Sequence, residues 1–170
     1  MTLWPIISHA ILYGVILSGV LFTLILGLVR INPEIMLNDY PPDIQAKYGP
    51  MSERSKRQRI PVAIIVIVVL LGIVTLSFRG VGTNPQGDLP FFTAFIHLFV
   101  MFTVFNLLDW LVLDWLIVVA IRPSFIILLG TEGFAGYEDY GFHFRGFLIG
   151  MVITLVTSIL VAGVVTALVG

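Results

Sequence analysis

The sequence has no cysteine and few charged residues. Because none of the 170 residues is cysteine, disulfides, thiol catalysis and metal centres held by cysteine are excluded. Only 11% of the residues are charged, against about 25% in a typical soluble domain. The net charge of −1 gives no reason to expect a nucleic-acid partner. The chain also lacks a P-loop, a GxGxxG, an HExxH and a nucleophile elbow, which weighs against a standard enzyme.

Apolar residues are abundant instead. They make up 58% of the chain, and the mean hydropathy is +1.05. Crossing a hydrocarbon core of ~30 Å takes about 20 apolar residues. Four runs meet this need, at about 6–29, 62–78, 91–121 and 147–169. We therefore predict an all-α, polytopic membrane protein, a single domain over 1–170 built as a bundle of four transmembrane helices. The third run would be ~46 Å long as one straight helix, so it must tilt, project or break.

The basic residues predict the orientation. Connections that carry an excess of Lys and Arg face the cytoplasm. The connections at about 30–61 and 122–146 hold eight basic residues, whereas the middle one holds only Arg79; the eight are Arg30, Lys47, Arg54, Lys56, Arg57, Arg59, Arg122 and Arg145. Both long loops are thus expected in the cytoplasm and both termini outside, in a plasma or cell inner membrane. No basic region precedes the first run, so it is expected to be a retained span. Pro61 and Pro90 are expected to begin the second and third helices.

Three polar residues interrupt the third run. Asn106, Asp109 and Asp114 lie where charged groups are costly. On an α-helix Asn106 and Asp109 would be about 60° apart, but Asp109 and Asp114 would be about 140° apart and would not form a two-carboxylate site. Asp109 allows three interpretations. It is a structural carboxyl that binds another helix, a proton- or cation-handling group in a transport path, or part of a metal or catalytic site with loop residues.

Two histidines lie at matching depths near the outer side. His9 on the first run and His97 on the third, with Tyr13 one turn from His9, could meet in an outward-facing pocket. Histidine pairs bind metals or haem and shuttle protons. The alternative is that each histidine only hydrogen-bonds to backbone or interfacial water. No cofactor can be assigned from these residues.

The second long loop is rich in glycine, aromatic and acidic residues. One interpretation is a ligand or metal site, because carboxylates with imidazole suit divalent metals. Gly141 is expected to prevent one helix from presenting Glu138, Asp139 and His143 together. The other interpretation is an aromatic belt at the lipid headgroups with its charges in water. The candidate residues are Glu132, Glu138, Asp139 and His143.

The first long loop contains a predicted short helix. Asp39 is expected to cap it, the prolines that follow fit its first turn, and Gly49 with Pro50 ends it. The basic run 52–59 that follows is interpreted as the ordinary topology signal, with an anionic-lipid or regulatory patch as the alternative.

Small residues recur at every fourth position of the fourth run. This spacing lets helix backbones approach closely. The row fits either an intramolecular seam or the face of a homodimer, and its central members are Gly150, Thr154, Ser158 and Ala162.

These observations favour a small membrane protein without enzymatic activity of its own. It would act as an accessory, a scaffold or an oligomeric subunit, with the lipid bilayer and a homodimer or larger membrane complex as partners. The first alternative is a proton- or cation-coupled transporter that uses Asp109. The second is a membrane enzyme or metal-binding protein that uses the 130–145 loop.

Overall fold

The computed structural model describes residues 3–81 and 89–169, and the part of the chain it describes is helical without a strand. The long helices are α1 (Trp4–Ile31), α3 (Glu53–Ser77), α4 (Phe91–Leu108) and α5 (Tyr140–Val169). A π-helix, η3 (Asp109–Ile121), continues α4. The short helices are η1 (Pro33–Asp39), α2 (Pro42–Tyr48), η2 (Phe78–Gly80), η4 (Ser124–Ile126) and η5 (Ala135–Glu138).

Four helical segments are long and apolar enough to cross a membrane, as predicted. They are Trp4–Ile31, Glu53–Gly80, Phe91–Ile121 and Tyr140–Leu168. The third begins directly after Pro90, as expected. The prediction for the second was wrong, because α3 begins at Glu53 and encloses Pro61. Helix therefore extends through the basic run, which the sequence analysis placed in a loop.

The start of α5 also differs from the prediction. The helix begins at Tyr140, seven residues before the expected span, and includes Gly141 in its first turn. The Asp139 carboxylate caps this turn by accepting a hydrogen bond from the Phe142 amide at 2.8 Å. A cap of this kind offsets the low helix propensity of glycine. Glu138 belongs to η5 and Asp139 precedes α5, so α5 contains His143 but not the other two candidates.

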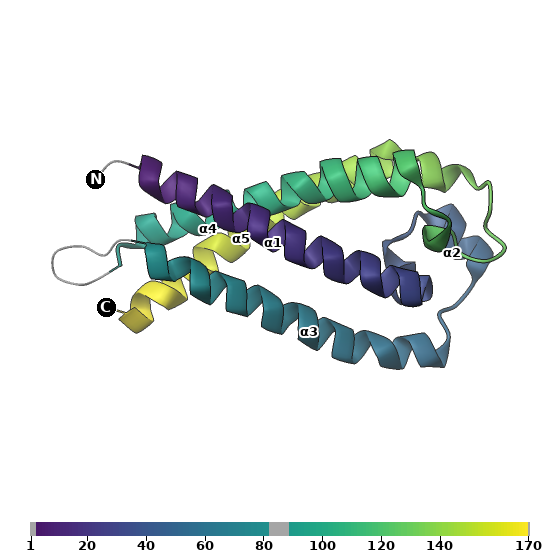
Figure 1. Ribbon diagram of the computed structural model, residues 1–170, viewed down its shortest axis with the longest axis horizontal. Coiled ribbons are helices and arrows are strands. Elements are labelled where there is room, and N and C mark those ends of the chain that lie inside the picture. The colour runs from purple at the N-terminus through teal and green to yellow at the C-terminus, as the bar shows by residue number, and fades with distance from the viewer. Residues whose placement is uncertain (1–2, 82–88, 170) are drawn as a thin grey trace. The chain divides into compact units, whose positions relative to one another are not determined.

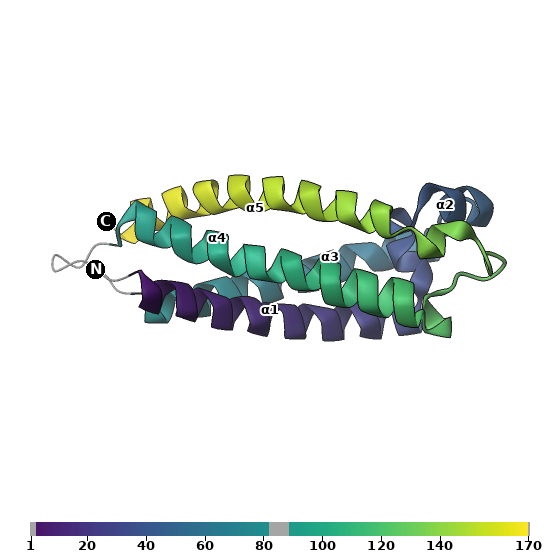
Figure 2. The same ribbon diagram turned by 90° about the horizontal axis from the view of Figure 1, so that it is seen from above.

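The chain divides into two compact units. Unit 1 comprises residues 1–19, 69–108 and 147–170, and unit 2 comprises residues 20–68 and 109–146. In unit 1, α1 packs closely on α4 at Gly14 (Figure 1). A Cβ at Gly14 would lie 2.7 Å from the Met101 carbonyl oxygen and 2.7 Å from the Val104 Cβ. Figure 2 shows α4 beside α5, where the Asn106 side chain donates a hydrogen bond to the Phe147 carbonyl.

Unit 2 has an apolar core formed largely by the segments between the long helices. In both views α2 lies against the connection that leads to α5 (Figures 1 and 2). The Asp43 carboxylate accepts a hydrogen bond from the Gly136 amide at 2.9 Å. Tyr40 and Tyr137 meet edge to face at 6.1 Å. The buried core residues are Val29, Leu37, Tyr40, Ile44, Met51, Ile126, Leu128 and Tyr137.

The short helix predicted in the first loop is present, but Asp39 does not cap it. Asp39 ends η1, and α2 begins at Pro42 with Pro41 at the cap position. Proline fits the first helical position because its fixed φ suits the helix and no N–H is needed there. Gly49 ends α2 with a φ of +89°, a conformation that glycine adopts without strain.

Candidate functional site

The π-helix changes the relation between Asp109 and Asp114. The segment Asp109–Ile121 forms i to i+5 hydrogen bonds, such as that from the Arg122 amide to the Ile117 carbonyl at 2.9 Å. This wider turn places residues five apart in sequence close to one face. The predicted angle of about 140° assumed an α-helix, and it does not hold here. Long π-helical segments are rare, and π-turns occur frequently at functional sites.

His143 joins this face from α5. Its Nδ1 lies 3.2 Å from Asp114 Oδ1, and its side chain is 9% exposed while that of Asp114 is 25% exposed. Asp109 is partly buried and interacts electrostatically with both Asp114 and His143. We call Asp109, Asp114 and His143 the acid–histidine cluster. All three belong to unit 2.

Asp39 lies at the edge of this cluster, a position that was not predicted from the sequence. Desolvation raises the pKa of Asp39 above its ordinary value, Arg59 opposes this effect, and Asp114 adds to it. Asp39 also interacts electrostatically with Asp109. Its place in the sequence predicts only a capping role for Asp39, because nothing local indicates that η1 approaches the third span.

The acidic loop residues are engaged in local structure. Glu132 accepts a hydrogen bond from the Gly130 amide at 3.2 Å, and Glu138 pairs with Arg122 at 3.1 Å. Asp139 caps α5 and lies 3.7 Å from Arg145. His143 therefore lies near Asp114 and is not grouped with Glu132, Glu138 and Asp139. In residues 3–81 and 89–169, no three His, Asp or Glu side chains are grouped as a metal site would require.

Unit 1 brings His9 and His97 together. Their ring centroids are 5.5 Å apart, and Tyr13 contacts His9 at 4.8 Å. Ser77 on α3, which the sequence analysis did not select, binds both rings. The Ser77 carbonyl accepts from His9 Nε2, and the Ser77 hydroxyl lies 2.9 Å from His97 Nε2.

The hydrogen-bond directions show that the Nε2 atom of His97 carries a proton. Ser77 donates its hydroxyl proton to the Val74 carbonyl at 2.7 Å, so its oxygen accepts from His97 Nε2–H. His97 is fully buried, and its Nδ1 has no hydrogen-bond partner among the described residues. In the neutral ring the proton therefore lies on Nε2 of His97, and the Nδ1 lone pair has no partner among the described residues.

The other two predicted features of unit 1 form one seam. Asn106 donates to the Phe147 carbonyl at 3.1 Å and packs on Gly150, where an added Cβ would overlap the Asn106 amide. Thr154, Ser158 and Ala162 are buried, with exposed fractions of 6%, 0% and 0%. These three residues are thus covered within unit 1, and the choice between an intramolecular seam and a homodimer face stays a prediction.

A network of side-chain hydrogen bonds holds the start of α3 in unit 2. The Glu34 carboxylate accepts hydrogen bonds from the Ser52 amide and from the Ser52 and Ser55 hydroxyls. Asn32 donates to Ser55 and to Gln58. Desolvation acts to raise the pKa of Glu34, but the hydrogen bonds from Ser55 and Ser52 outweigh it, so this pKa lies below its ordinary value.

We expect Glu34→Gln to remove part of the acid sensitivity of folding. Because the folded pKa of Glu34 is lowered, its stabilising contribution is present above the unfolded value of 4.5 and is lost as the pH falls through the folded value. Thermal midpoints in detergent, measured from about pH 7 to about pH 3, should fall less steeply for Glu34→Gln than for the wild type. Glu132→Gln is the control. Equal slopes for the wild type and Glu34→Gln would contradict the assigned role.

Comparison with known proteins gives no relative for this chain: no family model, no curated protein and no solved structure matches it. The function proposed below therefore rests on the residues of this chain.

Proposed function

We propose that the protein is an integral membrane protein that carries protons across the bilayer through the acid–histidine cluster. Its long connections would face the cytoplasm and its termini the outside, since eight of the nine basic residues lie on those connections or on the helix ends beside them. The observation that carries the proposal is the contact between His143 and Asp114, formed on the π-helical face that also holds Asp109.

The chemistry of the cluster suits protons. Ionisable residues within membrane-spanning segments are rare and mark ion pathways and proton relays. Histidine is the side chain whose ordinary titration falls between pH 5 and 8. A proton needs only a single acceptor at each step, and His143 Nδ1 lies 3.2 Å from Asp114 Oδ1. Asp114 and His143 are close enough to exchange a proton without any large movement.

An accessory or scaffolding subunit is the second candidate. The observation that favours it is the local engagement of the loop acids, because Glu132, Glu138 and Asp139 each contribute to turns, caps or ion pairs. An accessory subunit would use the cluster only to hold η3 against α5.

Proton entry into vesicles tests the proposal. The purified protein is reconstituted into vesicles that contain a pH-sensitive dye, and a potassium diffusion potential, negative inside, is imposed. We expect the interior to acidify faster than in vesicles without protein. If protein-containing and empty vesicles acidify at the same rate, proton transport is contradicted and the accessory role becomes the better account.

A further inference from the structure

The N-terminal end of α3 carries two arginines without partners. Arg54 and Arg57 are exposed, and neither guanidinium forms an ion pair with another described residue. The neighbouring basic residues Lys56 and Arg59 do have partners. Lys56 pairs with Glu53 at 2.7 Å, and Arg59 interacts electrostatically with Asp39. The positive charge that is not neutralised in this helical turn is therefore concentrated on Arg54 and Arg57.

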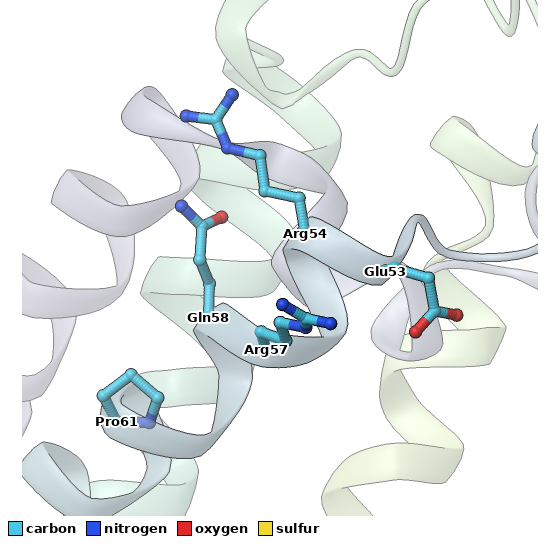
Figure 3. Close-up of a pocket in the computed structure, with 5 residues that line it drawn as sticks. All are labelled: Glu53, Arg54, Arg57, Gln58 and Pro61. Carbon is cyan, nitrogen blue, oxygen red and sulfur yellow. The ribbon is translucent and has the colours of Figure 1, made fainter.

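These two arginines line an open hollow in the surface. Its other lining residues are Glu53, Gln58 and Pro61 (Figure 3). Figure 3 shows the side chains of Arg54, Arg57 and Gln58 projecting from neighbouring turns of α3. The carboxylate of Glu53 is the one negative group among these five residues, and its pairing with Lys56 reduces its repulsion of an anion.

The face that carries the hollow becomes apolar further along α3. Steps of three and four residues lead from Arg57 through Pro61 to Ile64, Ile65 and Val68, which share one side of a helix. The exposed fractions of Ile64, Ile65 and Val68 are 56%, 49% and 63%. From Pro61 to Val68 this apolar stripe extends ~10 Å, within the ~15 Å depth of one leaflet.

We propose that this face binds an anionic phospholipid, with its phosphate between Arg54 and Arg57 and an acyl chain along Ile64, Ile65 and Val68. Guanidinium groups bind phosphate oxygens through paired hydrogen bonds, and the cytoplasmic leaflet supplies anionic lipids. Gln58 can donate to headgroup oxygens. A free phosphate ion would use only the arginines, whereas a phospholipid also covers the apolar stripe. The inference rests on the proposed membrane insertion but not on proton transport.

Lipid-dependent stability tests the inference. The thermal midpoint of the full chain in neutral detergent is measured while phosphatidylglycerol, phosphatidylcholine or inorganic phosphate is added. We expect phosphatidylglycerol to raise the midpoint in a saturable manner, and phosphatidylcholine and phosphate to have much smaller effects. Removing both guanidiniums with R54Q/R57Q should weaken the apparent affinity for phosphatidylglycerol by about tenfold or more.

Two further variants separate this site from a general charge effect. Lys47→Gln removes one exposed positive charge from α2, outside the hollow, and should retain the phosphatidylglycerol effect. Ile64→Asn should weaken it, because the stripe then becomes polar. The inference is overturned if phosphatidylcholine or inorganic phosphate stabilises the wild type as well as phosphatidylglycerol does, or if R54Q/R57Q binds like the wild type. It is also overturned if Lys47→Gln weakens binding as much as R54Q/R57Q. Because the assay measures no proton flux, its outcome is independent of the transport proposal.

Discussion

Replacing Asp109 with asparagine or His143 with glutamine is expected to slow proton entry into vesicles by about tenfold or more. Neither amide can bind and release a proton, so each transfer would have to bypass the cluster. A rise of only ~1.4 kcal/mol in the barrier gives a tenfold slower rate. Both replacements keep the approximate size of the side chain, so a slower rate would reflect lost proton binding more than lost packing.

Glu132→Gln is the matched control for these variants. It also converts a carboxylate to an amide, but Glu132 is exposed and only accepts the Gly130 amide, which a glutamine oxygen can replace. Its rate should equal that of the wild type. Variants at Asp109 and His143 that fold with wild-type thermal midpoints and still carry protons at the wild-type rate would show that the cluster is structural.

Gly14→Ala is expected to destabilise unit 1. The added methyl group would lie 2.7 Å from the Met101 carbonyl oxygen and 2.7 Å from the Val104 Cβ. Both atoms are fixed to the backbone of α4, so α1 and α4 would have to separate. Overpacking of this kind costs about 1–3 kcal/mol. The thermal midpoint in detergent should therefore fall clearly below that of the wild type.

Gly19→Ala provides the comparison on the same helix. A Cβ at Gly19 would have no atom within 4 Å among the described residues, and alanine favours helix over glycine by about 1 kcal/mol. Its midpoint should equal or exceed that of the wild type. If the two alanine variants had the same stability, the close contact between α1 and α4 at Gly14 would be refuted.

Sequence predicted the long helices well because hydropathy is a local property. It placed His9 and His97 at one depth, and the structure brings them together through Ser77. Ser77 was missed because a lone serine in an apolar run resembles a small packing residue. The early start of α3 was missed because Glu34, which holds Ser52 and Ser55, is distant in sequence.

The acid–histidine cluster could not be predicted from residue spacing. The five-residue separation of Asp109 and Asp114 indicates opposite sides of an α-helix but neighbouring positions on a π-helix. No sequence pattern in the segment Asp109–Ile121 marks it as π-helical, since it is about as apolar as the preceding α-helix. His143 appeared to belong with the nearby loop acids, whereas the start of α5 at Tyr140 directs it to Asp114.

The proposal that Asp109 belongs to a proton-binding cluster is tested by its reactivity toward an apolar carbodiimide. Such reagents attack protonated carboxyl groups, and mass spectrometry locates and quantifies the adduct in the reconstituted protein. We expect an adduct at Asp109, and we expect its rate of formation to change in Asp114→Asn, because both carboxyl groups lie on one face of η3. Glu132→Gln should leave the rate unchanged. No adduct at Asp109, or equal rates in the wild type and Asp114→Asn, would show that the two aspartates do not share one proton-binding cluster.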